Sequence, residues 1–284
     1  MKYRHRYHAG NFADCFKHIV LLELLGQVLR KATPILYLET HAGQGGYELS
    51  ESGQVGSQEH RSGIGRLREA SALPKPVRAY VDLVERLGCA AGQPGVLNTY
   101  PGSPLLALSV LRENDRTVLY ELYPPTAREL ARRINRRRNV RVHCSDGYAG
   151  LREQLPPKER RGVVLIDPPY EHPQQEFENL LTALKEAHAR WPTGIYAMWY
   201  PVKRRAAIQP FHSRIKAAGI RRILCAELGI YPDDSRVGLN GCGMIIVNPP
   251  FQLERALGEA LPVLHLALGG RPGTRAACFW LVPE

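Results

Sequence analysis

Residues 35–46 read I-L-Y-L-E-T-H-A-G-Q-G-G, a short apolar run that passes directly into a glycine-rich turn. The run from Ile35 to Thr40 has the length and composition of a buried strand. Gly43 and Gly45 allow the backbone of the turn to approach a ligand where a Cβ would collide. The turn lacks both the G-x-G-x-x-G of dinucleotide-binding folds and the G-K-[ST] of a P-loop. By itself it is equally well explained as an ordinary exit from a strand.

The same pattern of an apolar strand, a polar turn and a helix recurs downstream. Three further strands end at acids, which are Glu121, Asp146 and Asp167. Strands that alternate with helices predict an α/β fold, here a Rossmann-like parallel sheet with helices on both faces. Ligands of such sheets bind outside the carboxyl ends of the strands. The three acids are therefore expected to share one crevice with the glycine turn. The main helices are expected at residues 13–31, 173–190, 204–218 and 251–268.

One interval departs from the usual spacing of nucleotide-binding folds. The acid that binds the ribose usually follows the glycine turn by about 20 residues, whereas Glu121 follows Gly45 by 76. We therefore expect a small helical lobe, residues 48–99, inserted between a first segment, residues 1–47, and the rest of the main domain, residues 100–284. Residues 100–104, where the chain re-enters the main domain, predict the start of a helix with Ser103 as N-cap and Pro104 at the first helical position.

Composition points to a polyanionic partner in a reducing compartment. The chain has 284 residues, 44% of them hydrophobic, and a formal net charge of +11; thirty of its 38 basic residues are Arg. Arginine suits phosphate, although codon preference and solubility also explain such a balance. The six cysteines form no C-x-x-C pair, which argues against a zinc site or disulfides. With neither a signal peptide nor a membrane span in the pattern, a cytoplasmic location is expected.

The strand-end acids and the glycine turn suit S-adenosylmethionine. Glu39 is placed to meet the methionine end of a sulfonium cofactor, directly or through water. Glu121 is placed to hold ribose hydroxyls, and Asp146 to accept a hydrogen bond from the cofactor's adenine amine. For each acid the competing explanation is a cap on the helix that follows.

The stretch Asp167-Pro168-Pro169-Tyr170 is the most specific signal in the chain. The lone pair of an exocyclic adenine amine is delocalised into the ring, so an enzyme must orient that nitrogen. The Asp167 carboxylate and the Pro168 carbonyl can accept its two N–H groups, and the prolines stiffen the loop. Tyr170 is expected to stack on the flipped base. A similar stretch, Asn248 to Phe251, comes three strands later and is interpreted as a structural turn before the last helix.

The N-terminus, Y-R-H-R-Y-H-A-G-N-F-A-D-C-F-K-H, interleaves basic and aromatic residues as RNA-binding segments do. A solvated tail is the competing explanation. Metal binding is the other alternative, but the spacing matches no zinc pattern. Its candidate ligands would be His5, His8, Cys15 and His18.

Together these stretches resemble the RlmJ family of bacterial 23S rRNA adenine-N6 methyltransferases. The resemblance rests on the N-terminal segment, L-E-T-H-A-G-Q-G, Y-P-G-S-P-L, L-I-D-P-P-Y, G-I-Y-A-x-W-Y-P-V and W-L-V-P-E, and spans essentially the whole chain. It implies a class I methyltransferase domain, S-adenosylmethionine as donor and S-adenosylhomocysteine as product, and one adenine of naked or partly assembled 23S rRNA as target. A monomer without metal is expected.

The same resemblance implies roles for individual residues. Asp167 would be the catalytic acid group, assisted by Lys17, and Tyr3 and His5 would touch the RNA. The residues in or against the cofactor site would be His18, His41, Ser103, Glu121, Asp146, Gly147 and Asp167. Glu39 stands where Asp is expected in this family, a small departure.

Two alternatives remain open at this stage. The first keeps the chemistry and replaces the substrate by a DNA adenine, which differs from RNA at the 2′-hydroxyl. The second is a non-catalytic RNA-binding protein with a degenerate cofactor pocket.

Overall fold

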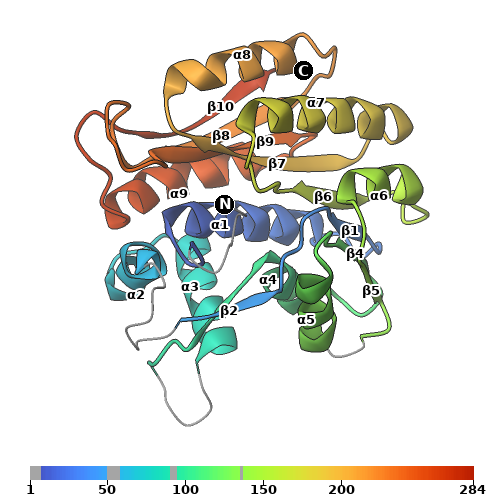
Figure 1. Cartoon of the computed structure of the whole chain (residues 1–284), viewed down its shortest axis with the longest axis horizontal. Helices are drawn as coiled ribbons and strands as arrows, with labels where there is room; N and C mark the ends of the chain where they lie inside the picture. Colours follow the sequence, from blue (N-terminus) through green and yellow to red (C-terminus); the bar gives the residue numbers. More distant parts are fainter. Residues whose placement is uncertain (1–7, 50–57, 90–94, 135–136) are drawn as a thin grey trace.

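The structure is a computed structural model of the chain, and it describes residues 8–49, 58–89, 95–134 and 137–284 (Figure 1). These residues form an eight-stranded sheet in the order β10-β8-β9-β7-β6-β1-β4-β5. Its strands are β1 (Leu36–Glu39), β4 (Arg116–Tyr120), β5 (Val140–His143), β6 (Gly162–Ile166), β7 (Ile195–Val202), β8 (Ile223–Gly229), β9 (Gly241–Val247) and β10 (Ala276–Val282). A two-stranded ribbon joins β2 (Gly46–Glu48) to β3 (Thr99–Pro101).

The helices cover both faces of this sheet, as the sequence predicts. The helices are α1 (Phe12–Val28), η2 (Arg61–Gly65), α2 (Arg66–Glu69), α3 (Lys75–Gly88), α4 (Ser103–Val110), α5 (Pro124–Ile134), α6 (Gly147–Gln154), α7 (Pro173–Arg190), α8 (Arg205–Lys216) and α9 (Leu253–Ala267). One apolar cluster includes residues of α1, α3, α4, α5 and α9, and a second includes residues of α6, α7 and α8. Figure 1 shows these two groups on opposite sides of the strands.

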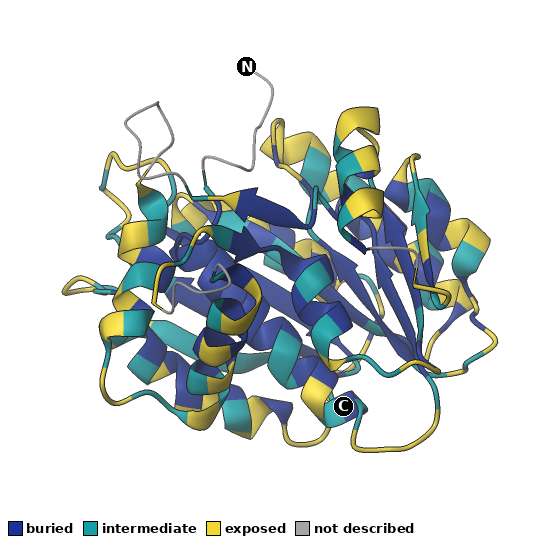
Figure 2. Ribbon diagram, turned by 90° about the horizontal axis from the view of Figure 1, so that it is seen from below, coloured by how far each residue is buried: buried dark blue, intermediate teal, exposed yellow. Residues whose placement is uncertain are grey.

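Strand direction defines the functional edge. β1, β4, β5, β6 and β7 run parallel, so their carboxyl ends lie together. β9 runs antiparallel between β7 and β8, and β8 therefore has the direction of β7. The central strands are buried on both faces, which is shown by their dark colour in Figure 2 and explains their continuous apolar composition. Ligand-binding side chains can therefore project only from the strand ends and loops.

The segment before β3 packs against α1. Helices α3 and η2 both contact α1; Gly63 permits the approach of η2 to the start of α1, and Gly88 permits the approach of α3 to β3. A Cβ on Gly63 would lie 2.0 Å from the Gly10 carbonyl oxygen, and one on Gly88 would lie 2.0 Å from the Thr99 carbonyl oxygen. Where the expected lobe begins and ends stays a prediction, because residues 50–57 and 90–94 lie outside the described part of the chain.

Two details differ from expectation. Helix α1 ends at Val28, with the C-cap at Leu29, before the expected end at residue 31. The prediction of Ser103 as an N-cap was wrong. Gly102 is the cap, and Ser103 is the first residue of α4, where its hydroxyl serves another partner described below. Within the described residues, no helix has the length and apolar character needed to cross a membrane.

Candidate active site

Asp167 follows β6 at the carboxyl edge and is joined to α1 by an ion pair. The Lys17 ammonium donates to Asp167 Oδ2 at 2.6 Å and lies 2.9 Å from Asp14 Oδ1, one helical turn earlier. All three side chains are largely buried; that of Asp167 is 16% exposed. Two carboxylates and one ammonium leave a net negative charge, which complements a cationic ligand.

The electrostatics of Lys17 keep it charged. Burial by itself would lower the pKa of Lys17, but Asp14 and Asp167 outweigh burial and raise that pKa well above its ordinary value. Lys17 is therefore charged at neutral pH and holds one carboxylate oxygen of Asp167. Asp14 was not singled out from the sequence, although its spacing of three residues from Lys17 on a helix is a readable signal.

The glycine turn after β1 is held by Glu121. The Gly43 amide donates to Glu121 Oε2 at 3.0 Å, and the Tyr123 amide donates to Oε1 at 2.8 Å. Gly43 and Gly45 both have positive φ, at 61° and 79°. A Cβ on Gly43 would lie 2.4 Å from the Tyr47 hydroxyl oxygen, so only glycine fits there. Glu121 therefore fixes the shape of the turn, and the close approach of its backbone to a ligand stays a prediction.

Glu39 is enclosed by protein partners. It is fully buried; Tyr37 donates to its Oε2 at 2.9 Å, and the Ser103 hydroxyl donates to Oε1. Burial raises the pKa of Glu39 to about 7, although the bonds from Ser103 and Tyr37 and the charge of Lys17 act in the opposite direction. Ser103 therefore touches the carboxylate of β1 rather than capping its own helix. A direct contact between Glu39 and a cofactor stays a prediction.

His41, Asp146 and Gly147 meet where β1 and β5 end. His41 Nδ1 lies 2.8 Å from the Thr40 hydroxyl. Burial lowers the pKa of His41 to about 4, against the opposite influence of Asp167 and Asp146, so the ring is neutral at pH 7. Asp146 is exposed and caps α6 by accepting from the Tyr148 amide at 2.9 Å. A Cβ on Gly147 would lie 2.0 Å from the Thr40 carbonyl oxygen, which explains the glycine.

His18 belongs to a buried hydrogen-bonded chain behind the site. Its Nδ1 lies 2.7 Å from the Tyr100 hydroxyl, which lies 2.8 Å from the Tyr80 hydroxyl, and Tyr80 donates to Cys15 Sγ at 3.4 Å. These hydrogen bonds connect α1 to α3 and to β3. Cys15 and His18 are thus engaged in this network, and His8 Nδ1 pairs with Glu59 at 3.0 Å. These three residues do not converge on a shared metal position.

The loop after Asp167 turns its aromatic residue inward. Pro168 is buried and Pro169 is exposed. Tyr170 has a positive φ of 50°, and its hydroxyl donates to the Trp199 carbonyl at 2.8 Å. The ring packs against Phe177 and Trp199 in the second apolar cluster. Stacking of Tyr170 on a base remains a prediction, and this conformation does not present the ring face for it.

The second proline pair lies at the opposite edge of the sheet. Asn248 follows β9, and because β9 is antiparallel, its end adjoins the start of β7. The Asn248 amide donates to the carbonyls of Pro192 and Gly194, both at 2.8 Å. Its interpretation as a structural turn is confirmed. Tyr3 and His5, the expected RNA contacts, lie outside the described residues.

The residues at this edge fit the expected cofactor. Glu121 follows β4 and Asp167 follows β6, the two strands beside β1, Asp146 follows β5 beyond β4, and the surplus charge is negative. A sulfonium nucleoside needs close backbone, acceptors for hydroxyl and amine groups, and an anionic environment. Glu121, Asp146 and Asp167 supply the acceptors and the anionic environment.

The strand order, with β9 antiparallel between β7 and β8 and β10 antiparallel at the edge, and the acid-lined carboxyl edge define a class I methyltransferase fold. The chain belongs to the family described as "Ribosomal RNA large subunit methyltransferase D, RlmJ", whose model matches residues 32–282. It is 39% identical over 284 residues to proteins named ribosomal RNA large subunit methyltransferase J from Escherichia coli K12 and Haemophilus influenzae, with 100% of each chain covered. A crystal structure of a Legionella pneumophila protein, 34% identical, matches with a TM-score of 0.83 and covers 96% of this chain and 97% of its own.

Proposed function

We propose that this protein transfers the methyl group of S-adenosylmethionine to the N6 amine of one adenine in 23S rRNA. Membership of the family supports methylation of large-subunit ribosomal RNA. The observation that carries the adenine assignment is the position of Asp167 and Pro168 at the carboxyl edge beside the glycine turn. The protein acts in the cytoplasm as a monomer, on naked or partly assembled RNA.

The cofactor would lie across the ends of β1, β4 and β5. Glu121 would hold the ribose hydroxyls while it fixes the turn, and Asp146 would accept from the adenine amine. His41 and Gly147 would border the same space, whereas His18, Glu39 and Ser103 would support it from behind. When bound, S-adenosylmethionine supplies a methyl group already activated by the sulfonium charge.

The remaining work is to orient a weak nucleophile. Asp167 and the Pro168 carbonyl would accept the two N–H groups of the target amine and direct its lone pair toward the methyl group. Positive charge develops on that nitrogen during transfer, and the Asp167 carboxylate is already in place to stabilise it. Lys17 acts on Asp167 as a positioning residue, because its 2.6 Å ion pair fixes the carboxylate plane. Tyr3 and His5 would contact the RNA.

The test combines binding with mapping. Calorimetry should detect S-adenosylmethionine binding to the protein alone. Mass mapping of methylated adenines in 23S rRNA, with and without the protein, should then show one adenine that gains a single methyl group. Transfer to DNA adenine but not to RNA would reject the proposal in favour of the DNA alternative. Absence of cofactor binding would revive the non-catalytic one.

A further inference from the structure

A second cavity opens at the carboxyl edge, beyond β7. Its volume is about 270 Å³, and its walls come from the ends of β7 and β8, the start of β9, and the loops that follow β8 and α9. Because β8 is parallel to β7 and β6, this cavity is on the same edge as Asp167. β7 extends four residues beyond Met198, the partner of Ile166, so strand spacings of about 4.8 Å and a rise of about 3.3 Å per residue place the cavity on the order of 15 Å from Asp167.

Asn240 lies in the wall of this cavity. The residue is 4% exposed and lines the wall. Its amide nitrogen donates to the Lys203 carbonyl at 2.7 Å and to the Ser235 carbonyl at 3.4 Å, which fixes the orientation of the side chain. The amide oxygen Oδ1 is buried without a partner among the described residues. The two bonds of Asn240 therefore hold the loop after β8 against the end of β7 as a fixed wall of the cavity.

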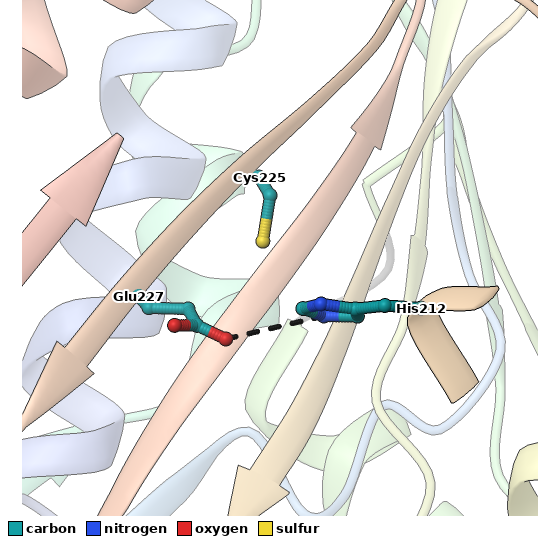
Figure 3. Close-up of side chains that lie close together, drawn as sticks. All are labelled: His212, Cys225 and Glu227. Atoms are coloured by element: carbon teal, nitrogen blue, oxygen red, sulfur yellow. Dashed lines mark ion pairs between the residues drawn. The ribbon is translucent and has the colours of Figure 1, made fainter. Parts of the chain in front are cut away.

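Glu227 forms the opposite wall, and a buried network holds it. Figure 3 shows Glu227 of β8 turned toward His212 of α8, with Cys225 beside them. Their ligand atoms lie within 4.8 Å of one another, a spacing that a metal ion could use. The Tyr200 hydroxyl already serves all three: it donates to Glu227 Oε1 at 2.8 Å and lies 3.0 Å from His212 Nε2 and 3.2 Å from Cys225 Sγ. We interpret the group as a support for Glu227 rather than a metal centre.

Arg205 places donors beside these acceptors. Its Nη1 donates to Glu227 Oε2 at 3.1 Å, and its side chain is 41% exposed. The guanidinium keeps further N–H groups for a ligand. An acidic acceptor next to a guanidinium matches the edge of a nucleobase, which presents amine donors beside carbonyl or ring-nitrogen acceptors. The volume lies just under the ~300–1,000 Å³ of pockets for drug-sized molecules, which suits a single ring system.

The rim connects the cavity with the active site. Tyr231 lines the cavity, the Arg271 guanidinium lies 4.9 Å over its ring, and Phe12 packs edge-on against it at 6.4 Å. Phe12 is the first residue of α1, the helix that carries Lys17. The rim is therefore basic and aromatic at Arg271 and Tyr231, as the binding of single-stranded RNA requires, and it packs against the first residue of the helix that carries Lys17.

We propose that this cavity binds one unpaired base of the substrate RNA, on the same strand as the target adenine and near it. The inference rests on the proposed function, because it needs RNA at Asp167. It adds a second anchoring point, which would select the RNA by a base that is not methylated.

The proposal is tested by a substitution that places a larger side chain in the cavity. A Cβ on Gly229 would lie 3.4 Å from the Arg275 carbonyl oxygen and 3.7 Å from Arg205 Nη2, both ordinary contacts, so a side chain can be introduced there, and Gly229→Leu adds bulk beside Arg205. Gly258→Leu, on an exposed position of α9 with open space around it, is the matched control. Affinity for a 23S rRNA transcript is measured first, without cofactor. Gly229→Leu should bind about 10- to 100-fold more weakly, since each bound base contributes about 1–3 kcal/mol, and Gly258→Leu should match the parent.

A scan of abasic RNAs then tests the base itself. Synthetic RNAs that cover the mapped adenine lose each neighbouring base in turn. Loss of the base at one position should weaken binding to the parent protein. The same loss should not lower the affinity of Gly229→Leu any further. Parental affinity of Gly229→Leu, or losses that multiply at every position, would overturn the proposal. If Gly229→Leu has a lower melting temperature than the parent protein, Arg205→Gln replaces it in the same comparison of abasic RNAs. Failure of the parent to methylate 23S rRNA rejects the proposed function instead, because the transcript-binding comparison does not depend on transfer.

Discussion

Asp167 and Asn248 each precede a pair of prolines, but only Asp167 faces the glycine turn. Asp167→Ala removes the acceptor that orients the amine, and we expect methyl transfer to fall by at least about 10²–10³. Asn248→Gly keeps the positive φ and loses two hydrogen bonds, which should cost about 1–2 kcal/mol in stability and leave transfer intact. Single-turnover assays at saturating RNA, with thermal melts, compare the two variants. An active Asp167→Ala protein would refute the site assignment.

Glu39 and His41 give the fold two opposing dependences on pH. The pKa of Glu39 is raised from 4.5 to about 7, so its stabilising contribution is present below pH 4.5 and lost as the pH rises through 7. The pKa of His41 is lowered from 6.5 to about 4, so its contribution is present above pH 6.5 and lost as the pH falls through 4. Between pH 4.5 and 6.5 the two effects oppose each other.

Separate variants should uncover each effect. Glu39→Gln should become less stable as the pH falls from 6.5 toward 4, by up to about 1.4 kcal/mol per unit. His41→Asn should become less stable as the pH rises from 4.5 to 7. Denaturant melts across this range measure both slopes. Identical slopes in the parent and in both variants would contradict the assignment.

At the scale of elements, α6 must begin against the turn that follows β1. In Gly147→Ala the new Cβ would meet the Thr40 carbonyl oxygen at 2.0 Å, so helix and turn must separate. We expect a loss of about 1–3 kcal/mol in stability and weaker S-adenosylmethionine binding by calorimetry. Gly26→Ala, on an exposed turn of α1 with open space, should instead stabilise the protein by about 1 kcal/mol. Equal effects of the two substitutions would be inconsistent with this packing.

The elements also show where sequence patterns suffice. Continuous apolar runs predicted the parallel strands, and the acids after them predicted the functional edge, because both depend on local composition. Helix α7 begins and ends at the predicted residues 173–190. The hydroxyl of Ser103 could not be assigned to Glu39, since that bond joins residues 64 apart. The inward turn of Tyr170 depends on a positive φ that a tyrosine seldom adopts, so the pattern did not indicate it.

For the whole molecule, the charge of +11 predicts salt-dependent RNA binding. Each phosphate neutralised on a single strand contributes about 0.7 to the slope of log affinity against log salt. With several such contacts, the affinity for RNA should fall more than tenfold from low to moderate salt. Filter binding of a 23S rRNA transcript over a salt series measures this slope. A flat series would remove the argument from the basic surface.

The order in which the strands are made differs from the order in which they lie. β8 is synthesised before β9 but lies beyond it, so the edges of β7 and β8 that face β9 stay unpaired until residue 247 has been added. At about 5–20 residues per second, this interval after Gly229 lasts roughly one to four seconds. A growing chain therefore carries exposed backbone edges late in translation. We expect nascent chains arrested before Gly241 to associate with chaperones and to be cut readily by protease, and chains arrested well past β9 to resist both.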